Sequence, residues 1–261
     1  MSVGGWQPRW IGAASRQLYA ALHPAPNVRV GVVMAPPLLH EQPRSRRVLV
    51  EIASRFAEAG LPCLRFDYFG TGDSAGAGEE HDFLAMHADL DAAVAALRND
   101  AGVAQIAVLA FRGAALPAWS WAEARAEIAA LALWEPVVDG AAWLMQLEAA
   151  DRSERLNRYG VLQDDPNDTN LMGLPTSPIW RADVAAARIG TPPPERSPVW
   201  VIARGAAVAG DAIASSPCRF ELPPDAPRFD DGVGIENAMF LSRKLFDVID
   251  ELGRAFAALG A

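Results

Sequence analysis

The most informative residue of this chain is Arg112, because of the turn in which it stands. The stretch Gln105–Leu116 (QIAVLAFRGAAL) reads as an apolar strand, one charged residue and a run of small residues that favours a helix. Such a strand-to-helix turn can expose a nucleophilic serine between small neighbours. Here Ala110, Gly113 and Ala114 keep the small positions, but the central residue is an arginine. Because a guanidinium cannot attack a carbonyl and leave again as a serine does, the sequence predicts an elbow without a nucleophile.

The elements around this turn predict an α/β fold in one domain, residues 1–261. Apolar strands are expected at residues 28–34, 61–66, 105–111, 128–134, 198–204 and 218–222. Amphipathic helices are expected at residues 46–59, 83–97 and 241–259, among others. Strands that alternate with helices favour a mainly parallel sheet flanked by helices, whereas residues 8–23 predict an antiparallel start. The rhythm breaks over residues 135–196, which we interpret as a small lid inserted after the sixth strand.

Composition and charge narrow the function classes. A chain of 261 residues, 51% of them hydrophobic, can bury a full core. Its net charge of −9 argues against electrostatic binding of nucleic acid, which needs a basic face. The sequence holds neither a signal peptide nor an apolar run of membrane-spanning length, and Cys63 and Cys218 provide no metal spacing and no disulfide framework. We expect a cytoplasmic protein without metal or cofactor, and the sequence indicates no oligomeric state.

Two motifs carry a family resemblance. The run FDYFGTGDS at residues 66–74, the AFRGA of the elbow and the downstream order of strand, lid, strand, strand and helix resemble the α/β-hydrolase superfamily. The similarity is to its serine aminopeptidase and lysophospholipase groups. A narrower resemblance, carried by APPLLHE at 35–41 and RSRR at 44–47, is to hydrolase-like proteins associated with exosortase and exopolysaccharide gene clusters. We expect the polar residues of the 66–74 turn to bond to its backbone.

The resemblance allows the catalytic triad to be tested position by position. In the family the nucleophile comes first, then an acid after the next-to-last strand, then a histidine after the last. Arg112 replaces the nucleophile, and the acid position holds Ala207 or Val208, with Asp211 slightly farther along. Residues 223–237 contain no histidine, because all four histidines precede the elbow. No residue there relays a proton near neutral pH as histidine does, so the sequence predicts a degenerate triad.

Two roles remain for Arg112. A helix N-terminus favours an anion, and a guanidinium holds a carboxylate or phosphate with two parallel hydrogen bonds. This predicts a pocket for an anionic small molecule, formed by Arg112, Phe111, Gly113 and His40. The alternative is that Arg112 fills an empty site and is paired within the chain, as buried arginines usually are. The candidate carboxylates for that pairing are Glu41, Asp211, Asp230, Asp231 and Glu236.

His40 and Glu41 are expected in the loop after the third strand, where hydrolases build part of the oxyanion hole. For any proton-transfer step that survives, His40 is the best carrier, Glu41 its orienting partner, and Asp211 a third auxiliary; a loop-bracing pair is the plainer interpretation. The sequence thus predicts a pseudo-hydrolase that binds an anionic small molecule or a protein partner. Two alternatives stay open. One is a biosynthetic enzyme that uses the cleft for acyl- or glycan-linked chemistry without a serine nucleophile, and the other is an ester or amide hydrolase.

Overall fold

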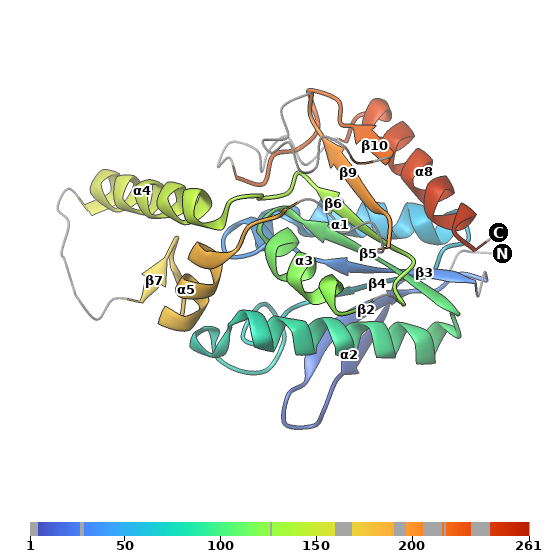
Figure 1. The fold of residues 1–261 in the computed structure, drawn as a ribbon, viewed down its shortest axis with the longest axis horizontal. Helices are drawn as coiled ribbons and strands as arrows, with labels where there is room; N and C mark the ends of the chain where they lie inside the picture. The colour runs from blue at the N-terminus through green and yellow to red at the C-terminus, as the bar shows by residue number, and fades with distance from the viewer. Residues whose placement is uncertain are drawn as a thin grey trace.

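Eight strands form one mainly parallel sheet, in the order β1-β2-β4-β3-β5-β6-β9-β10 (Figure 1). The computed structural model describes residues 5–26, 29–125, 127–159, 169–190, 197–205, 216, 218–230 and 241–260. The strands are β1 (Gln7–Ile11), β2 (Leu18–His23), β3 (Val30–Ala35), β4 (Cys63–Phe66), β5 (Gln105–Phe111), β6 (Ala130–Trp134), β9 (Val199–Ala203) and β10 (Cys218–Glu221). The β1–β2 and β2–β4 pairs are antiparallel and the other pairs are parallel. The predicted α/β class and antiparallel start are confirmed.

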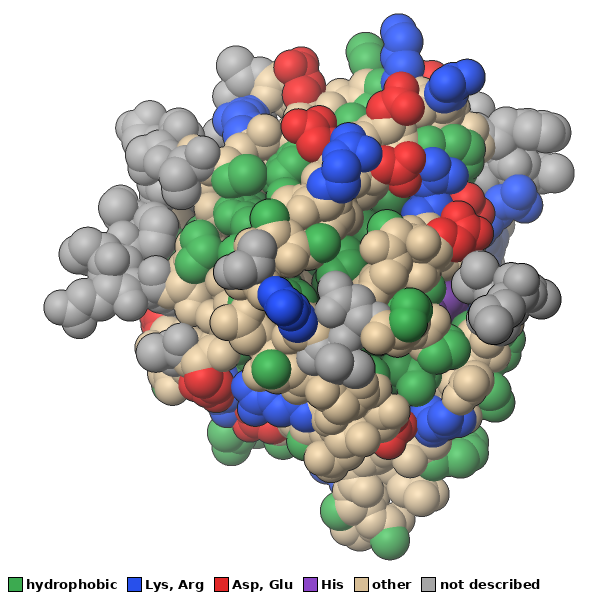
Figure 2. Space-filling model, turned by 90° about the vertical axis from the view of Figure 1, so that its right-hand side faces the viewer, with side chains coloured by type: hydrophobic (Ala, Val, Ile, Leu, Met, Phe, Trp, Pro, Cys, Tyr) green, Lys and Arg blue, Asp and Glu red, His purple; other side chains and the backbone are tan. Residues whose placement is uncertain are grey.

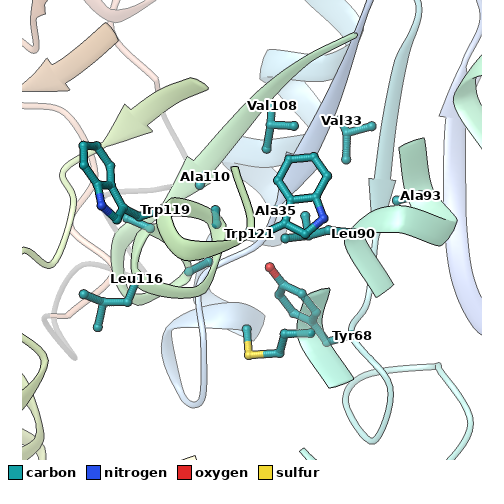
Figure 3. Close-up of a cluster of buried hydrophobic side chains, with 14 of the residues drawn as sticks. Val33, Ala35, Tyr68, Leu90, Ala93, Val108, Ala110, Leu116, Trp119 and Trp121 are labelled. Carbon is teal, nitrogen blue, oxygen red and sulfur yellow. The ribbon is translucent and has the colours of Figure 1, made fainter. Parts of the chain in front are cut away.

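Helices cover both faces of the sheet. They are α1 (Glu41–Glu58), α2 (Phe83–Ala101), α3 (Ala115–Glu123), α4 (Gly140–Tyr159), α5 (Pro178–Ala186) and α8 (Arg243–Ala258), with short 3₁₀ turns η1 (Gly78–Glu80) and η2 (Arg112–Ala114). On β3, Val32 and Met34 pack with α1 and α8, whereas Val33 and Ala35 pack with α2 and α3. Figure 3 shows the second of these clusters. A strand buried on both faces explains why its sequence is almost continuously apolar.

Helix α1 begins at Glu41, earlier than the predicted start at Arg46. Pro43 lies in its first turn, where a residue without an N–H is tolerated because that group has no partner within the helix. His40 is the N-cap residue, so the expectation that His40 and Glu41 belong to a loop was wrong. The Glu41 side chain is fixed on a helix and is fully buried.

Between β6 and β9 the chain leaves the sheet, within the region predicted as a lid. The described part of this insertion consists of α4, α5 and a hairpin of β7 (Asn170–Leu171) and β8 (Leu174–Pro175), and it lies at one end of the sheet in Figure 1. Its inner side joins the core through Trp143 and Trp180, whose rings meet edge to face at 6.3 Å. Met145 and Ile179 are exposed on it. The insertion is therefore packed onto the core by two tryptophans.

The surface and the thiols add two further observations. On the face shown in Figure 2, acidic and basic side chains of the described residues are interspersed. Both Cys63 and Cys218 are free thiols. Across the described part of the chain, every helix is either too short or too polar to cross a membrane.

Candidate functional site

The predicted elbow forms where β5 passes through η2 into α3. Arg112 has a φ of 53°, a left-handed backbone conformation that residues other than glycine rarely adopt. A Cβ atom on Gly113 would lie 2.4 Å from Cη2 of Trp143, so the insertion requires a glycine there. Phe111 is fully buried and packs against Trp134, with ring centroids 5.5 Å apart. The backbone strain of a nucleophile turn is thus present, with an arginine at its centre.

The Arg112 side chain is paired within the chain. Its Nε donates to Oε2 of Glu41 at 3.1 Å and its Nη2 to Oε1 at 3.3 Å, a bidentate contact. Nη2 also donates to Oδ2 of Asp230 at 3.1 Å, and Nη1 to the carbonyl oxygen of Glu135 at 3.3 Å. Each nitrogen of the guanidinium therefore has an acceptor. Of the five carboxylates expected as partners, Glu41 and Asp230 make the contact, while Asp211, Asp231 and Glu236 lie outside the described residues.

Burial and charge act in opposite directions on these groups. Burial raises the pKa of the Glu41 carboxyl, and the Arg112 charge opposes that rise. Burial also acts to raise the pKa of Asp230, but hydrogen bonds from Arg228 and the charge of Arg112 outweigh it and lower that pKa. For Arg112 burial acts to lower the pKa, and Glu41 more than compensates. Both oxygens of Glu41 accept N–H bonds, which is the geometry of an ionised carboxylate.

A second ion pair extends the contacts along the carboxyl ends of the strands. Oε1 of Glu135, just after β6, accepts a bond of 2.5 Å from Nη1 of Arg204, just after β9. Nη2 of Arg204 in turn donates to the carbonyl oxygens of Ala226 and Pro227, in the chain after β10. We call the connected ionic side chains the elbow network: Glu41, Arg112, Glu135, Arg204, Arg228 and Asp230. Ion pairs thus link the ends of five strands where the resemblance places catalytic residues.

His40 lies close to this network but is a poor proton carrier. Burial and the charges of Arg44 and Arg112 lower its pKa to about 4, with Asp230 opposing. Its Nδ1 is buried without a hydrogen-bond partner among the described residues. Glu41 does not orient the imidazole, because both carboxylate oxygens are held by Arg112. The structure therefore brings His40, Glu41 and Arg112 together without forming a proton relay.

The other three histidines lie away from the elbow. His23 on β2 accepts a bond from Arg65, and the buried His81 contacts the carbonyl of Phe69. His87 on α2 lies 3.0 Å from the hydroxyl of Ser120 on α3. That hydroxyl also donates to the carbonyl of Pro117 in its own helix, as helical serines commonly do. This serine–histidine contact belongs to the α2–α3 interface, not to the elbow turn.

The 67–74 turn is held by its own polar residues, as expected. Oδ2 of Asp67 accepts the Asp73 N–H at 3.0 Å, and Oδ1 accepts a bond from Gln42 at 2.9 Å. The Ser74 hydroxyl donates to the Asp67 carbonyl at 2.6 Å and accepts the N–H of Tyr19. These contacts account for the polar composition of the turn. Its side chains support the backbone.

A cavity of about 230 Å³ lies beside the elbow network, between this turn and the insertion. Its lining residues are Leu38, Leu39, Gln42, Pro43, Arg46, Tyr68, Gly70, Thr71, Gly72, Gly78, His81, Leu174, Pro175, Thr176 and Trp180. Arg112 and its partners are not among them. The sequence analysis missed this cavity, although the glycines of the turn and the tryptophan-containing insertion were both visible, because their proximity arises only in the fold.

No family model matches the chain, and no curated protein does. Similar solved structures cover nearly its whole length. Est1E from Butyrivibrio proteoclasticus, solved with ferulic acid bound, is 16% identical, with a TM-score of 0.61 over 96% of this chain and 99% of that one. A hypothetical protein from Pseudomonas aeruginosa is 15% identical, with a TM-score of 0.66 over 99% and 94% of the two chains. The α/β hydrolase GrgF from Penicillium sp. sh18 is 18% identical, with a TM-score of 0.51 over 76% and 80%. The chain has the α/β-hydrolase fold.

Proposed function

We propose that this chain uses the α/β-hydrolase fold as a pseudo-hydrolase, a binding protein that does not cleave esters or amides. The observation that carries the proposal is Arg112, which takes the strained elbow position with all three of its guanidinium nitrogens bonded inside the protein. An arginine so placed supplies no nucleophile. The absence of histidine from residues 223–237 removes the second component of Ser-His-Asp chemistry.

The ionic contacts also limit how an anion could bind at Arg112. The Glu41 side chain is 1% exposed, whereas that of Asp230 is 34% exposed. An anionic ligand would therefore compete with Asp230 for Nη2 and leave Glu41 in place. Internal pairing makes Arg112 a structural clamp across the carboxyl ends of the strands. A binding function of the protein, toward a small molecule or a protein partner, then has to use another surface or displace Asp230.

Ester hydrolysis is the second candidate, favoured by the structural similarity to Est1E. It would need a nucleophile other than the elbow residue. The contact between His87 and the Ser120 hydroxyl is the arrangement to test, although the pKa of His87 is lowered, mainly by burial. The biosynthetic alternative, acyl- or glycan-linked chemistry without serine, would depend on His40. That imidazole is uncharged at neutral pH and is a weak base.

An ester assay tests the proposal. The protein is incubated with a fluorophosphonate probe and, separately, with p-nitrophenyl acetate and butyrate, beside an active serine esterase as positive control. We expect no labelling and hydrolysis at the buffer rate, both for the wild type and for Ser120→Ala. Labelling that Ser120→Ala abolishes would replace the proposal with an esterase that uses that serine. Turnover that survives in Ser120→Ala would equally overturn it.

A cytoplasmic location and a link to exopolysaccharide synthesis belong to the same proposal. The two free thiols support a reducing compartment. The APPLLHE and RSRR motifs support the gene-cluster association. Localisation of a tagged full-length chain by cell fractionation tests the first, and finding the chain in an envelope fraction would contradict it.

A further inference from the structure

The cavity beside the elbow network has the features of a ligand site. We propose that it binds a small uncharged aromatic molecule, one ring bearing a hydrogen-bond acceptor. The inference deepens the proposed function, because it names the site and ligand class of the pseudo-hydrolase. It rests on the size of the cavity, the chemistry of its walls, the pairing of its one cationic side chain and an unpartnered N–H group.

Size sets the first limit. The cavity measures about 230 Å³. An apolar cavity of roughly 150 Å³ is known to accommodate benzene, so this one has room for a single substituted ring. A fused polycyclic ligand would need the insertion to move. The volume therefore favours a monocyclic molecule.

The walls are mainly apolar and partly aromatic. Leu38, Leu39 and Pro43 come from the start of α1 and the loop before it, and Leu174 comes from β8 of the insertion. Side chains of this type favour apolar ligands, because burial removes their surface from water. Tyr68 and Trp180 add aromatic rings, which interact with another ring by stacking or edge-to-face contact. Aromatic lining favours a ring over an aliphatic chain.

Charge excludes an anionic ligand from this cavity. Arg46 is its one cationic side chain at neutral pH, because burial lowers the pKa of His81 to about 4. Nη2 of Arg46 lies 3.2 Å from Oδ2 of Asp67, and Nη1 lies 3.6 Å from Oδ2 of Asp73. Two carboxylates thus compensate one guanidinium at the rim. A carboxylate ligand would find repulsion there, so an uncharged ligand is favoured.

One wall residue carries a hydrogen-bond donor with no acceptor. Trp180 is 1% exposed, and its Nε1 is buried without a partner among the described residues. A buried donor left unpaired is unfavourable, and an acceptor atom on a ligand would remove that cost. Tyr68 also has an unpartnered hydroxyl, but this end points toward the cluster of Leu90 and Trp121 (Figure 3). Trp180 is therefore the donor that we assign to the ligand.

Backbone strain accompanies the cavity. Leu39, one of its lining residues, has a φ of 52°. Left-handed conformations at residues other than glycine cluster at functional sites, because the surrounding structure has to maintain them. The strain at Leu39 is local to the cavity wall, as the strain at Arg112 is local to the elbow.

Calorimetry with three probes of known chemistry tests the proposal on the full chain. The probes are 4-methylphenol (neutral ring), 4-methylbenzoate (anionic ring) and hexanamide (neutral chain with an acceptor). We expect 4-methylphenol to bind and the other two to bind at least about tenfold more weakly, a difference of about 1.4 kcal/mol. Equal or tighter binding of 4-methylbenzoate or of hexanamide would overturn the assignment of ligand class.

Two matched substitutions locate the binding. Leu174→Trp fills the cavity from β8, and Leu84→Trp makes the same change on α2, where Leu84 is 78% exposed. We expect Leu174→Trp to weaken 4-methylphenol at least about tenfold and Leu84→Trp to leave it unchanged. Both variants are checked for folding by circular dichroism. Binding that Leu174→Trp does not alter would place the ligand elsewhere and overturn the proposal.

Trp180→Phe tests the indole N–H. The variant keeps a ring in the wall but removes Nε1, so 4-methylphenol should lose affinity several-fold while toluene, which has no acceptor, should not. A parallel loss for both ligands would contradict the role of the N–H. If no probe binds while the ester assay stays negative, the cavity inference fails and the pseudo-hydrolase proposal stands. Ester turnover with intact 4-methylphenol binding would give the reverse result.

Discussion

The elbow network and the cavity are neighbours with opposite character. Glu41 and Gln42 are consecutive on α1, yet Glu41 holds Arg112 whereas Gln42 donates to Asp67 in the wall of the cavity. The first region is ionic, filled and bonded at every guanidinium nitrogen. The second is mainly apolar and hollow, and it contains a buried N–H without a partner. The comparison teaches that a hydrolase fold can close its reactive centre with ion pairs and still keep a space for a ligand.

The physical reason lies in what each region needs from its residues. A buried arginine is stable only with matched acceptors, so its presence at the elbow demands Glu41 and Asp230. An apolar cavity requires only that no side chain fill it, and it has no charge to satisfy. The two regions can therefore change independently. The predictions below break each of them separately.

The largest effect is expected from removing the buried carboxylate of the elbow. Glu41→Ala leaves Arg112 charged and buried without its bidentate partner, which typically costs about 3–5 kcal/mol. Asp250→Ala is the matched control, because it breaks the more exposed bidentate pair with Arg55 and should cost about 1 kcal/mol or less. Urea unfolding measures both. A loss for Glu41→Ala no larger than that for Asp250→Ala would contradict the clamp role of Arg112.

Acid titration gives the next effect and separates the two regions through their histidines. The pKa is lowered to about 4 for His40 near the elbow and to about 4 for His81 in the cavity wall, in both cases mainly by burial. Between the ordinary value of 6.5 and about 4, the unfolded state binds protons that the folded state does not, so stability falls as pH falls. Each histidine contributes at most about 1.4 kcal/mol per pH unit.

His40→Gln and His81→Gln each remove one of these contributions. We expect both variants to show a shallower loss of stability than the wild type between pH 6.5 and 4, measured by urea unfolding at several pH values. Bound 4-methylphenol should alter the pH profile of the wild type and of His40→Gln in the same way, because His40 does not line the cavity. A wild-type profile that is flat over this range would refute the neutral, buried state of both imidazoles.

These two regions differ in how far the sequence could predict them. The elbow is a local motif, so the β5 strand, the Arg112 turn and its pairing with Glu41 or Asp230 were all within reach of the sequence. The start of α1 was missed because its first turn, EQPRSRR, is polar and contains a proline. The cavity was missed for another reason. It depends on contact between Gly78 and Pro175, nearly a hundred residues apart, and no local pattern encodes that distance.

The smallest effect comes from exposing each arginine on its accessible side. Asp230→Ala removes the half-exposed partner of Arg112, and Asp73→Ala removes the more exposed partner of Arg46 at the cavity rim. Each should cost about 1 kcal/mol or less in stability, as partly exposed ion pairs do. Phosphate should then raise the melting temperature of Asp230→Ala but not of Asp73→Ala, because Arg46 keeps Asp67 at 3.2 Å whereas Nη2 of Arg112 gains an open side.

Differential scanning fluorimetry with and without phosphate measures this difference, with sodium chloride at equal ionic strength as the control. Stabilisation of the wild type by phosphate would mean that Asp230 yields to an anion, and the anionic-ligand prediction at Arg112 would then gain support over the clamp. Stabilisation of Asp73→Ala would mean that the rim of the cavity accepts anions. The balance of one guanidinium against two carboxylates, on which the uncharged ligand class depends, would then be wrong.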